Sequence, residues 1–349
     1  MKRESDRTSP APDAPRRRLT GLLASGAVLA LVPPAPARAA DADGWKPTKP
    51  VNYVISVAPG GSVDLYARGI KSVLEQRQWT NGQPVIAENR PGAAGLLAIQ
   101  AVQRNAGDGH WLSTFHTGGI AGMVSGALKA DVRELTPVAM MVEESTFLVV
   151  HAESDLRTAQ ALVERLKRDP TALRFAVAPA LGQNIHLALA KPLKAAGVDI
   201  RKLTVAPFRS SGDSMIALVG GHVDVVCATG PAIVPHLASN RVRALVVVSR
   251  ERAGAPFASV PTWRELGVAA DYVSYNGVQL PRGATPDQVR FWEQTMKRVS
   301  ETPDWQQLVA KSGNKAVFIG AADSRRYVDE EVRDTQALLG ELGLVDSLK

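Results

Sequence analysis

The chain has 349 residues, 45% of them hydrophobic and 21% charged, with 41 Lys and Arg against 34 Asp and Glu. This composition is typical of a globular protein with one large or two modest domains, and it excludes a disordered tail or a fibre. Residues 1–39 hold seven of the basic and three of the acidic residues, so the remainder carries 34 against 31, which gives no support for a nucleic-acid partner.

The N-terminal residues have the pattern of an export signal. Three arginines at 16–18 precede a mostly apolar run over 19–32, and small residues at 35–39 offer an A-x-A cleavage site. This order predicts a cleavable signal peptide over residues 1–39 and a periplasmic protein, exported by the Sec or the twin-arginine route. The apolar run is shorter than the roughly 20 residues that span a bilayer. No cysteine lies near the cleavage point, so a lipoprotein is not expected.

Beyond the signal, strands, turns and helices alternate. Residues 51–57 form a short apolar run rich in β-branched residues, the glycine-containing segment 58–62 follows, and apolar residues recur at helical spacing from Val63. The same order predicts further strands at 84–88, 111–115, 173–178, 203–208, 223–228 and 243–249, and a C-terminal helix over 321–342. Repeated strand–loop–helix units predict an α/β architecture with mainly parallel sheets covered by helices.

The single cysteine, Cys227, excludes an internal disulfide framework, a CxxC redox pair and a zinc site with several thiolates. It stands in the apolar run 223–228, which favours a small buried hydrophobe over a reactive thiol. The histidines are scattered without the spacing of metal ligands. We therefore expect neither a metal nor a cofactor.

About 310 residues remain after the signal, more than one hydrophobic core usually serves, so two lobes are expected. Two segments are candidates for crossing between them: the apolar stretch 138–150, which Glu143-Glu144-Ser145 interrupts, and the strand-like 272–280. Open α/β sheets bind ligands at the carboxyl ends of their strands, which predicts a cleft between the lobes. The predicted lobes are residues 45–147 plus 272–349 for lobe 1, and residues 148–271 for lobe 2.

The loop after the first strand is the most informative one. Gly60 and Gly61 let backbone N–H groups approach a ligand, and Ser62 is predicted to cap the helix that follows. The first turn of that helix presents unpaired N–H groups and the positive dipole end, which suits a carboxylate or a phosphate, although such a turn is also a common tight connection. Asp64 would repel an anion, so we expect it to orient Ser62, a water or backbone donors, or to accept from a ligand amine or hydroxyl.

Two later loops have related chemistry. Gln183 and Asn184 offer amide donors where another helix starts, so two helix N-termini would face one cleft. His186 lies in the same loop, where a structural role and a ligand contact both remain open. Arg209 follows the strand predicted over 203–208, and its guanidinium either binds a carboxylate or stays solvated.

In this order, the loops resemble those of the periplasmic receptors of tripartite tricarboxylate transporters, the Bug-type solute-binding proteins. The similarity extends from about residue 45 to residue 343. The matching motifs are P-G-G-x-x-D at 59–64, E-N-R-P-G-A-x-G at 88–95, G-G-H-V-D at 220–224, R-V-R-A-L at 241–245 and V-P-T at 260–262.

The resemblance implies a two-lobed type II periplasmic binding fold, monomeric and not an enzyme. Such a receptor closes on a small carboxylate, whether a di- or tricarboxylate, an amino acid or an aromatic acid, and delivers it to membrane transporter subunits. Residues 88–95 are interpreted as scaffold, a turn with left-handed backbone followed by a helix start. The ligand-binding positions that the resemblance implies are Ala58, Gly60, Ser62, Asp64 and Thr117 in lobe 1, and Ala180, Gly182, Gln183, Asn184, His186, Arg209 and Thr229 in lobe 2.

Two alternatives remain open. The same cleft would suit a receptor that reports its ligand to a membrane sensor kinase, which the sequence does not distinguish from a transport receptor. A periplasmic hydrolase would need a nucleophile or metal constellation, and G-x-S-x-G, H-E-x-x-H and G-x-x-x-x-G-K are absent from the sequence. Catalytic triads are assembled in space, so this absence weakens the hydrolase hypothesis without removing it.

Overall fold

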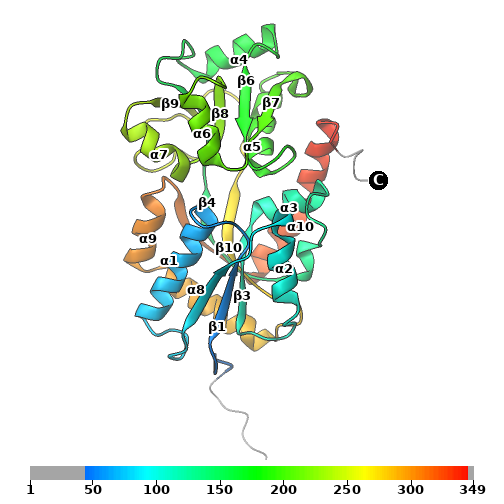
Figure 1. Ribbon diagram of the computed structural model, residues 1–349, viewed down its shortest axis with the longest axis vertical. Helices are drawn as coiled ribbons and strands as arrows, with labels where there is room; N and C mark the ends of the chain where they lie inside the picture. The colour runs from blue at the N-terminus through cyan, green and yellow to red at the C-terminus, as the bar shows by residue number, and fades with distance from the viewer. Residues whose placement is uncertain (1–43, 345–349) are drawn as a thin grey trace, which may run out of the picture. The chain divides into compact units, whose positions relative to one another are not determined.

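The computed structural model of the chain describes residues 44–344, which belong to one compact unit. The predicted signal peptide, residues 1–39, lies outside the described residues. The described strands fall into two sheets. In Figure 1 the strands of one sheet lie in the lower half of the view and those of the other in the upper half, with β10 (Ser274–Leu280) leading between them.

The first sheet has six strands in the order β11-β4-β10-β3-β1-β2. Strand β1 pairs in parallel with β2 and β3, whereas β10 is antiparallel to β3 and β4, and β11 is antiparallel to β4. Besides β10, its strands are β1 (Val51–Ile55), β2 (Val85–Asn89), β3 (Trp111–His116), β4 (Thr136–Glu144) and β11 (Lys315–Gly320).

The second sheet has five strands in the order β7-β6-β8-β5-β9. Strand β6 pairs in parallel with β7 and β8, whereas β5 is antiparallel to β8 and β9. Its strands are β5 (Thr146–His151), β6 (Arg174–Val177), β7 (Thr204–Pro207), β8 (Val225–Thr229) and β9 (Val242–Val248).

The α/β, two-lobed fold expected from the sequence is confirmed, but both sheets are mixed and not mainly parallel. The departures are β5, β10 and β11, which each enter a sheet from the side where the two sheets face each other. A strand that enters there has to run against neighbours whose carboxyl ends point to that side. Its direction is therefore set by pairing between distant residues, which a local strand–loop–helix pattern does not encode.

Helices cover both faces of each sheet because successive side chains of a strand point to opposite sides. Tyr53 of β1 joins one apolar cluster, and its neighbour Val54 joins another. In the same way Cys227 of β8 packs on one side and Val226 on the other. Around the first sheet lie α1 (Ser62–Gln76), α2 (Leu96–Gln103), α3 (Thr117–Val124), α8 (Pro286–Ser300), α9 (Pro303–Ala310) and α10 (Ala321–Glu341). Around the second lie α4 (Ala159–Arg168), α5 (Asn184–Ala195), α6 (Ser211–Val219) and α7 (Gly230–Ala238).

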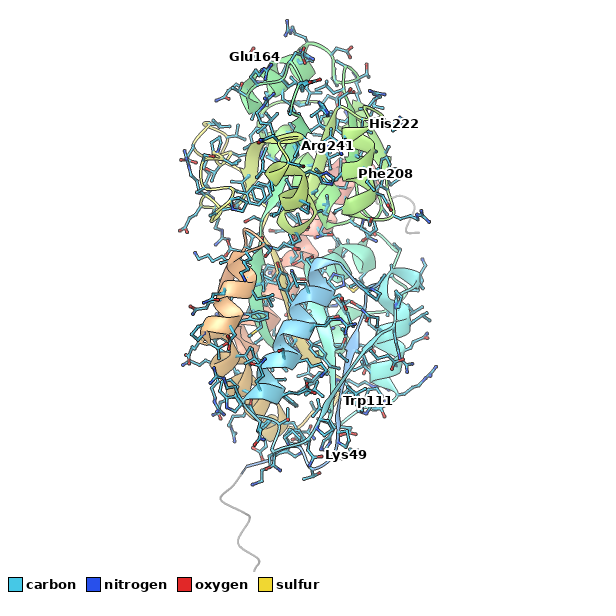
Figure 2. The ribbon with its side chains drawn as sticks, turned by 60° about the vertical axis from the view of Figure 1, so that its left-hand side comes forward. Lys49, Trp111, Glu164, Phe208, His222 and Arg241 are labelled. Atoms are coloured by element: carbon cyan, nitrogen blue, oxygen red, sulfur yellow. The ribbon has the colours of Figure 1, made fainter. Side chains whose placement is uncertain are left out.

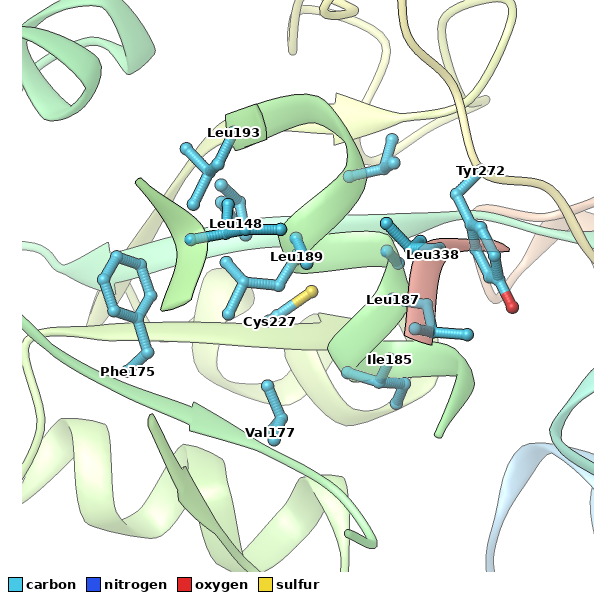
Figure 3. Close-up of a cluster of buried hydrophobic side chains, with 14 of the residues drawn as sticks. Leu148, Phe175, Val177, Ile185, Leu187, Leu189, Leu193, Cys227, Tyr272 and Leu338 are labelled. Atoms are coloured by element: carbon cyan, nitrogen blue, oxygen red, sulfur yellow. The ribbon is translucent and has the colours of Figure 1, made fainter. Parts of the chain in front are cut away.

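One buried cluster links the second sheet to helices of both lobes. Figure 3 shows Leu148, Phe175 and Cys227 of the second sheet around Leu189 of α5, with Leu187 of α5 next to Leu338 of α10. Cys227 is a free, fully buried cysteine, as predicted, and burial raises the pKa of its thiol. Helix α10 thus contributes to the apolar cluster that covers the second sheet, although it follows β11 of the first.

Candidate functional site

A cavity of about 490 Å³ lies where strands of the two sheets end. In Figure 2, Lys49, two residues before β1, and Trp111, the first residue of β3, lie at the far end of the first sheet, and Phe208, directly after β7, lies on the side of the second sheet that faces the first. We call this cavity the cleft. It is lined by residues 57–63, 116–118, Glu144, 178–179, 183–185, 209–212, Thr229, 231–232 and 274–276.

The N-termini of five helices, α1, α3, α5, α6 and α7, meet at the cleft. Within residues 44–344, the N-caps of α1, α3, α5 and α7 make no side-chain capping bond, whereas in α6 the Ser210 hydroxyl accepts from the Asp213 N–H at 3.1 Å. The first backbone N–H groups of a helix have no partner inside the helix, and they form its positive dipole end. The cleft is therefore surrounded by backbone donors and is suited to a small anion.

The loop between β1 and α1 keeps its backbone open to the cleft. Gly60 has a φ of 92°, a conformation that favours glycine. A Cβ added to Gly60 or Gly61 would meet no other atom within 4 Å, so both face open space. The N-cap of α1 is Gly61 and not Ser62 as predicted, since the helix begins at Ser62. The Ser62 side chain instead hydrogen-bonds to the buried carboxyl of Glu144, which lowers the pKa of that carboxyl.

Asp64 shapes this loop from behind. Its Oδ2 accepts from the Gly60 N–H at 3.0 Å, and its Oδ1 accepts from Asn89 Nδ2 at 2.8 Å and Arg68 Nε at 3.0 Å. Burial alone raises the pKa of Asp64, but the hydrogen bonds from Asn89, Gly60 and Arg68 outweigh it, and the pKa is lowered. Asn89 comes from the motif 88–95, so that motif supports the loop without lining the cleft.

The loop before α5 is shaped in a similar way by His186. The Gly182 N–H donates to His186 Nδ1 at 2.9 Å, and Gly182 has a φ of 77°. Burial lowers the pKa of His186 to about 4, so the ring is neutral at physiological pH and its Nδ1 can accept. Gln183 and Asn184 then line the cleft directly.

Arg209 lies at the mouth of the cleft. Its side chain is 97% exposed, and its Nε is 3.9 Å from Asp213 Oδ2. An ion pair this exposed contributes little to stability. The guanidinium is therefore solvated in this conformation and lies next to the cavity.

The structure brings most of the sequence-predicted positions together. Ala58, Gly60, Ser62, Thr117, Gln183, Asn184, Arg209 and Thr229 line the cleft. The other four, Asp64, Ala180, Gly182 and His186, do not line it. Of these, Asp64, Gly182 and His186 take part in hydrogen bonds that fix the two loops.

Sequence reasoning missed a polar floor made by the crossing strands. Glu144 ends β4, and Ser274 and Asn276 lie on β10; all three line the cleft and are 5%, 3% and 3% exposed, respectively. Ser274 pairs directly with Glu144, so the two side chains share a face of the sheet. The signal in the sequence was the pair Glu143-Glu144 within an otherwise apolar strand, because alternation turns one of the two to each face.

Thr117 links the cleft to the crossing strand. It is the first residue of α3, and its Oγ1 accepts from the Tyr275 N–H at 2.8 Å and lies 2.9 Å from the Tyr327 hydroxyl of α10. The Tyr327 hydroxyl also donates to the Val273 carbonyl at 3.2 Å. The Thr117 hydroxyl is thus already engaged by the frame of the cleft.

Fold and site together define a two-lobed solute-binding protein. The family model of the "tripartite tricarboxylate transporter family receptor" matches residues 70–344. A UPF0065 protein from the gbd 5' region of Cupriavidus necator is 30% identical over 85% of this chain and 89% of its own length. The chain therefore belongs to the tripartite tricarboxylate transporter receptor family, as the sequence motifs indicated.

Solved structures agree with this assignment. MatC from Rhodopseudomonas palustris, solved with bound malate, is 26% identical, with a TM-score of 0.70 over 84% of this chain and 99% of that one. The periplasmic binding protein BugD, at 22% identity and a TM-score of 0.72 over 85% of this chain and 99% of that one, shows the shared fold. Over residues 44–344, no helix combines the length and apolar character needed to cross a membrane.

Proposed function

We propose that the mature protein is a periplasmic receptor that captures a small carboxylate in the cleft and delivers it to membrane transporter subunits, without catalysis and as a monomer. The convergence of five helix N-termini on one cavity carries this proposal, because a carboxylate satisfies backbone N–H groups, and four of these N-termini have no side-chain cap within residues 44–344. Malate in the MatC structure supports the same ligand class.

The proposed ligand contacts come from both lobes, residues 45–147 plus 272–349 and residues 148–271. We assign the ligand's carboxylate to the N-termini of α1 and α5, through Ser62 and Asn184, with Arg209 closing over it from the mouth. Asp64 and His186 act through the loops that they hold. Closure then brings the two lobes together around the ligand.

A thermal-shift screen of residues 40–349 tests the proposal. At a concentration of 100 Kd, a ligand that binds only the folded state stabilises it by about 2.7 kcal/mol. We expect one or more mono-, di- or tricarboxylates, amino acids or aromatic acids to raise Tm by several degrees. Stabilisation by sugars or carboxylate-free amines alone would contradict an anion site.

Closure and the role of Arg209 have their own measurements. Small-angle X-ray scattering should show a smaller radius of gyration with the ligand than without it, and an unchanged value would contradict closure.

Arg209→Ala should weaken carboxylate binding by about tenfold, as expected for a lost charge-assisted contact of roughly 1.4 kcal/mol. Arg201→Ala, an exposed arginine outside the cleft, serves as the control.

A further inference from the structure

The floor of the cleft holds a carboxyl group that the protein leaves without a counter-charge. Glu144 Oε2 accepts from Asn276 Nδ2 at 3.3 Å, and among the described residues Glu144 Oε1 has no hydrogen-bond partner. Burial raises the pKa of Glu144, and the Ser62 hydroxyl and the Asn276 amide lower it by less. No basic side chain within residues 44–344 adds to these effects.

The preceding residue, Glu143, offers a comparison on the same strand. It points to the other face, outside the cleft, where burial also raises its pKa but Lys315 and Arg250 act against that rise. Two adjacent glutamates thus differ in their access to positive charge. A buried carboxylate without such a partner is costly, so Glu144 holds its charge only beside a compensating group and otherwise takes up a proton.

Two further oxygens beside Glu144 are also unsatisfied. Ser274 Oγ and Asn276 Oδ1 have no hydrogen-bond partner within residues 44–344, and both residues lie with Glu144 on the cleft side of the sheet. With Glu144 Oε1 they make three acceptor oxygens in one wall. An ammonium group has three N–H donors and a positive charge, which matches this set in both number and sign.

We propose that the ligand carries an ammonium group close to its carboxylate, and that Glu144, with Ser274 and Asn276, binds this ammonium and sets specificity for amino-carboxylates. The inference rests on the proposed function, since the helix N-termini hold the carboxylate. Ser62 connects the two sites: it opens α1, whose N–H groups face the cleft, and its side chain acts on Glu144. The terminal torsion of a glutamate is broad, so the carboxylate can turn an oxygen toward the ligand without strain.

Matched ligand pairs that differ only in one ammonium group test the proposal by calorimetry: succinate and aspartate, glutarate and glutamate, propionate and alanine, and 3-phenylpropionate and phenylalanine. In the wild-type protein, the amino member of one or more pairs should bind tenfold or more tightly than its partner. In Glu144→Gln that preference should fall below threefold, because the charge that pairs with the ammonium is gone. Glu143→Gln, the neighbouring glutamate on the other face, should keep the wild-type preference.

The outcomes separate this inference from the proposed function. If plain acids bind and the amino members never bind more tightly, or if Glu144→Gln keeps the preference, the role of Glu144 is overturned and carboxylate capture stands. If no member of any pair and no other carboxylate binds, carboxylate capture itself fails. Loss of an uncompensated buried charge should leave the Tm of ligand-free Glu144→Gln at or above the wild-type value, and Glu144→Ala provides a second variant for the same pairs.

Discussion

At the scale of single residues, the cleft depends on side chains that do not face it. Asp64 holds the backbone of the first loop, and His186 holds that of the second, each through one glycine N–H group. In the proposed complex the ligand is met largely by backbone donors, so its affinity should depend on how well these loops keep their shape. Loop-shaping residues therefore matter as much as those that line the cavity.

Replacing Asp64 with Asn should destabilise the protein by about 1–3 kcal/mol at pH 7, since it weakens hydrogen bonds to a buried charged acceptor. The folded-state pKa of Asp64 is lowered, so its contribution is fully present above the unfolded pKa, near 4, and is lost as the pH falls through the folded value. Urea unfolding at pH 7 and pH 3 should therefore show the difference between wild type and variant shrinking at pH 3.

The control for this prediction is Asp287→Asn. Asp287 also lies in the first turn of a helix, α8, but its carboxylate is exposed and pairs with Arg290 outside the cleft. It should change stability by less than about 0.5 kcal/mol at either pH. An Asp64→Asn variant that behaves like this control would show that the carboxylate does not hold the loop.

Residue identity predicted some of these roles and not others. Asp64 was expected to orient backbone donors because a carboxylate repels an anion, and the structure shows it bound to the Gly60 N–H. His186 could not be decided from the sequence, since its role depends on which way the ring turns. The apolar strand around Glu144 hides its role in the sequence, and only the pairing of Glu144 with Ser274 places it in the cleft.

At the scale of elements, α3 and α10 fix the returning strand β10 beside the cleft. The Thr117 hydroxyl of α3 accepts from the Tyr275 N–H of β10 and contacts the Tyr327 hydroxyl of α10. The Tyr327 hydroxyl in turn donates to the Val273 carbonyl, just before the strand. The rings of Tyr275 and Tyr327 also pack edge to face, with centroids 4.9 Å apart. The beginning of β10 is thus bound by side chains from two helices.

Replacing Thr117 with Val should remove this connection and keep the side-chain volume. The Tyr275 N–H then loses its acceptor in a buried position, which costs about 1–3 kcal/mol. Thr117→Ser retains the hydroxyl and should lose less than half as much. Chemical denaturation measures both, and a loss in Thr117→Val no larger than that in Thr117→Ser would show that the hydrogen bond to the Tyr275 N–H does not hold the strand.

Element order could be predicted from sequence where the signal is local. The strand–loop–helix units around 51–76 and 173–195 follow from apolar runs and glycine turns, and the structure confirms them. The antiparallel directions of β5 and β10 could not be predicted in this way. They depend on which strands a returning chain lies beside, and pairs such as Asn276 with His116 are separated by more than a hundred residues.

At the scale of the whole molecule, α10 spans both lobes. Its middle packs near α3 and β4, while Leu338 and Leu339 reach the apolar cluster that surrounds α5. A second cavity of about 430 Å³ lies between α5, α10 and the segment before β10. Glu331 of α10 lines it together with Lys191 of α5 and Tyr272. Charge at Glu331 therefore acts on the contact between the two lobes.

Burial raises the pKa of Glu331 to about 7, against lowering effects from Tyr272, Lys191 and Thr335. A raised carboxyl pKa means that the folded state holds the proton more tightly, so this stabilisation is complete below the unfolded pKa, near 4.5, and is lost as the pH rises through 7. Glu331→Gln cannot ionise and should be about 1–3 kcal/mol more stable than the wild type at pH 8, but similar to it at pH 4.

Urea unfolding across this pH range measures the difference in stability. The neighbouring variant Glu330→Gln, at an exposed position, is the control and should follow the wild type. A wild-type advantage at pH 8 would mean that ionised Glu331 is stabilised by Lys191 more than it is penalised by burial, and that the contact between α5 and α10 is held by charge.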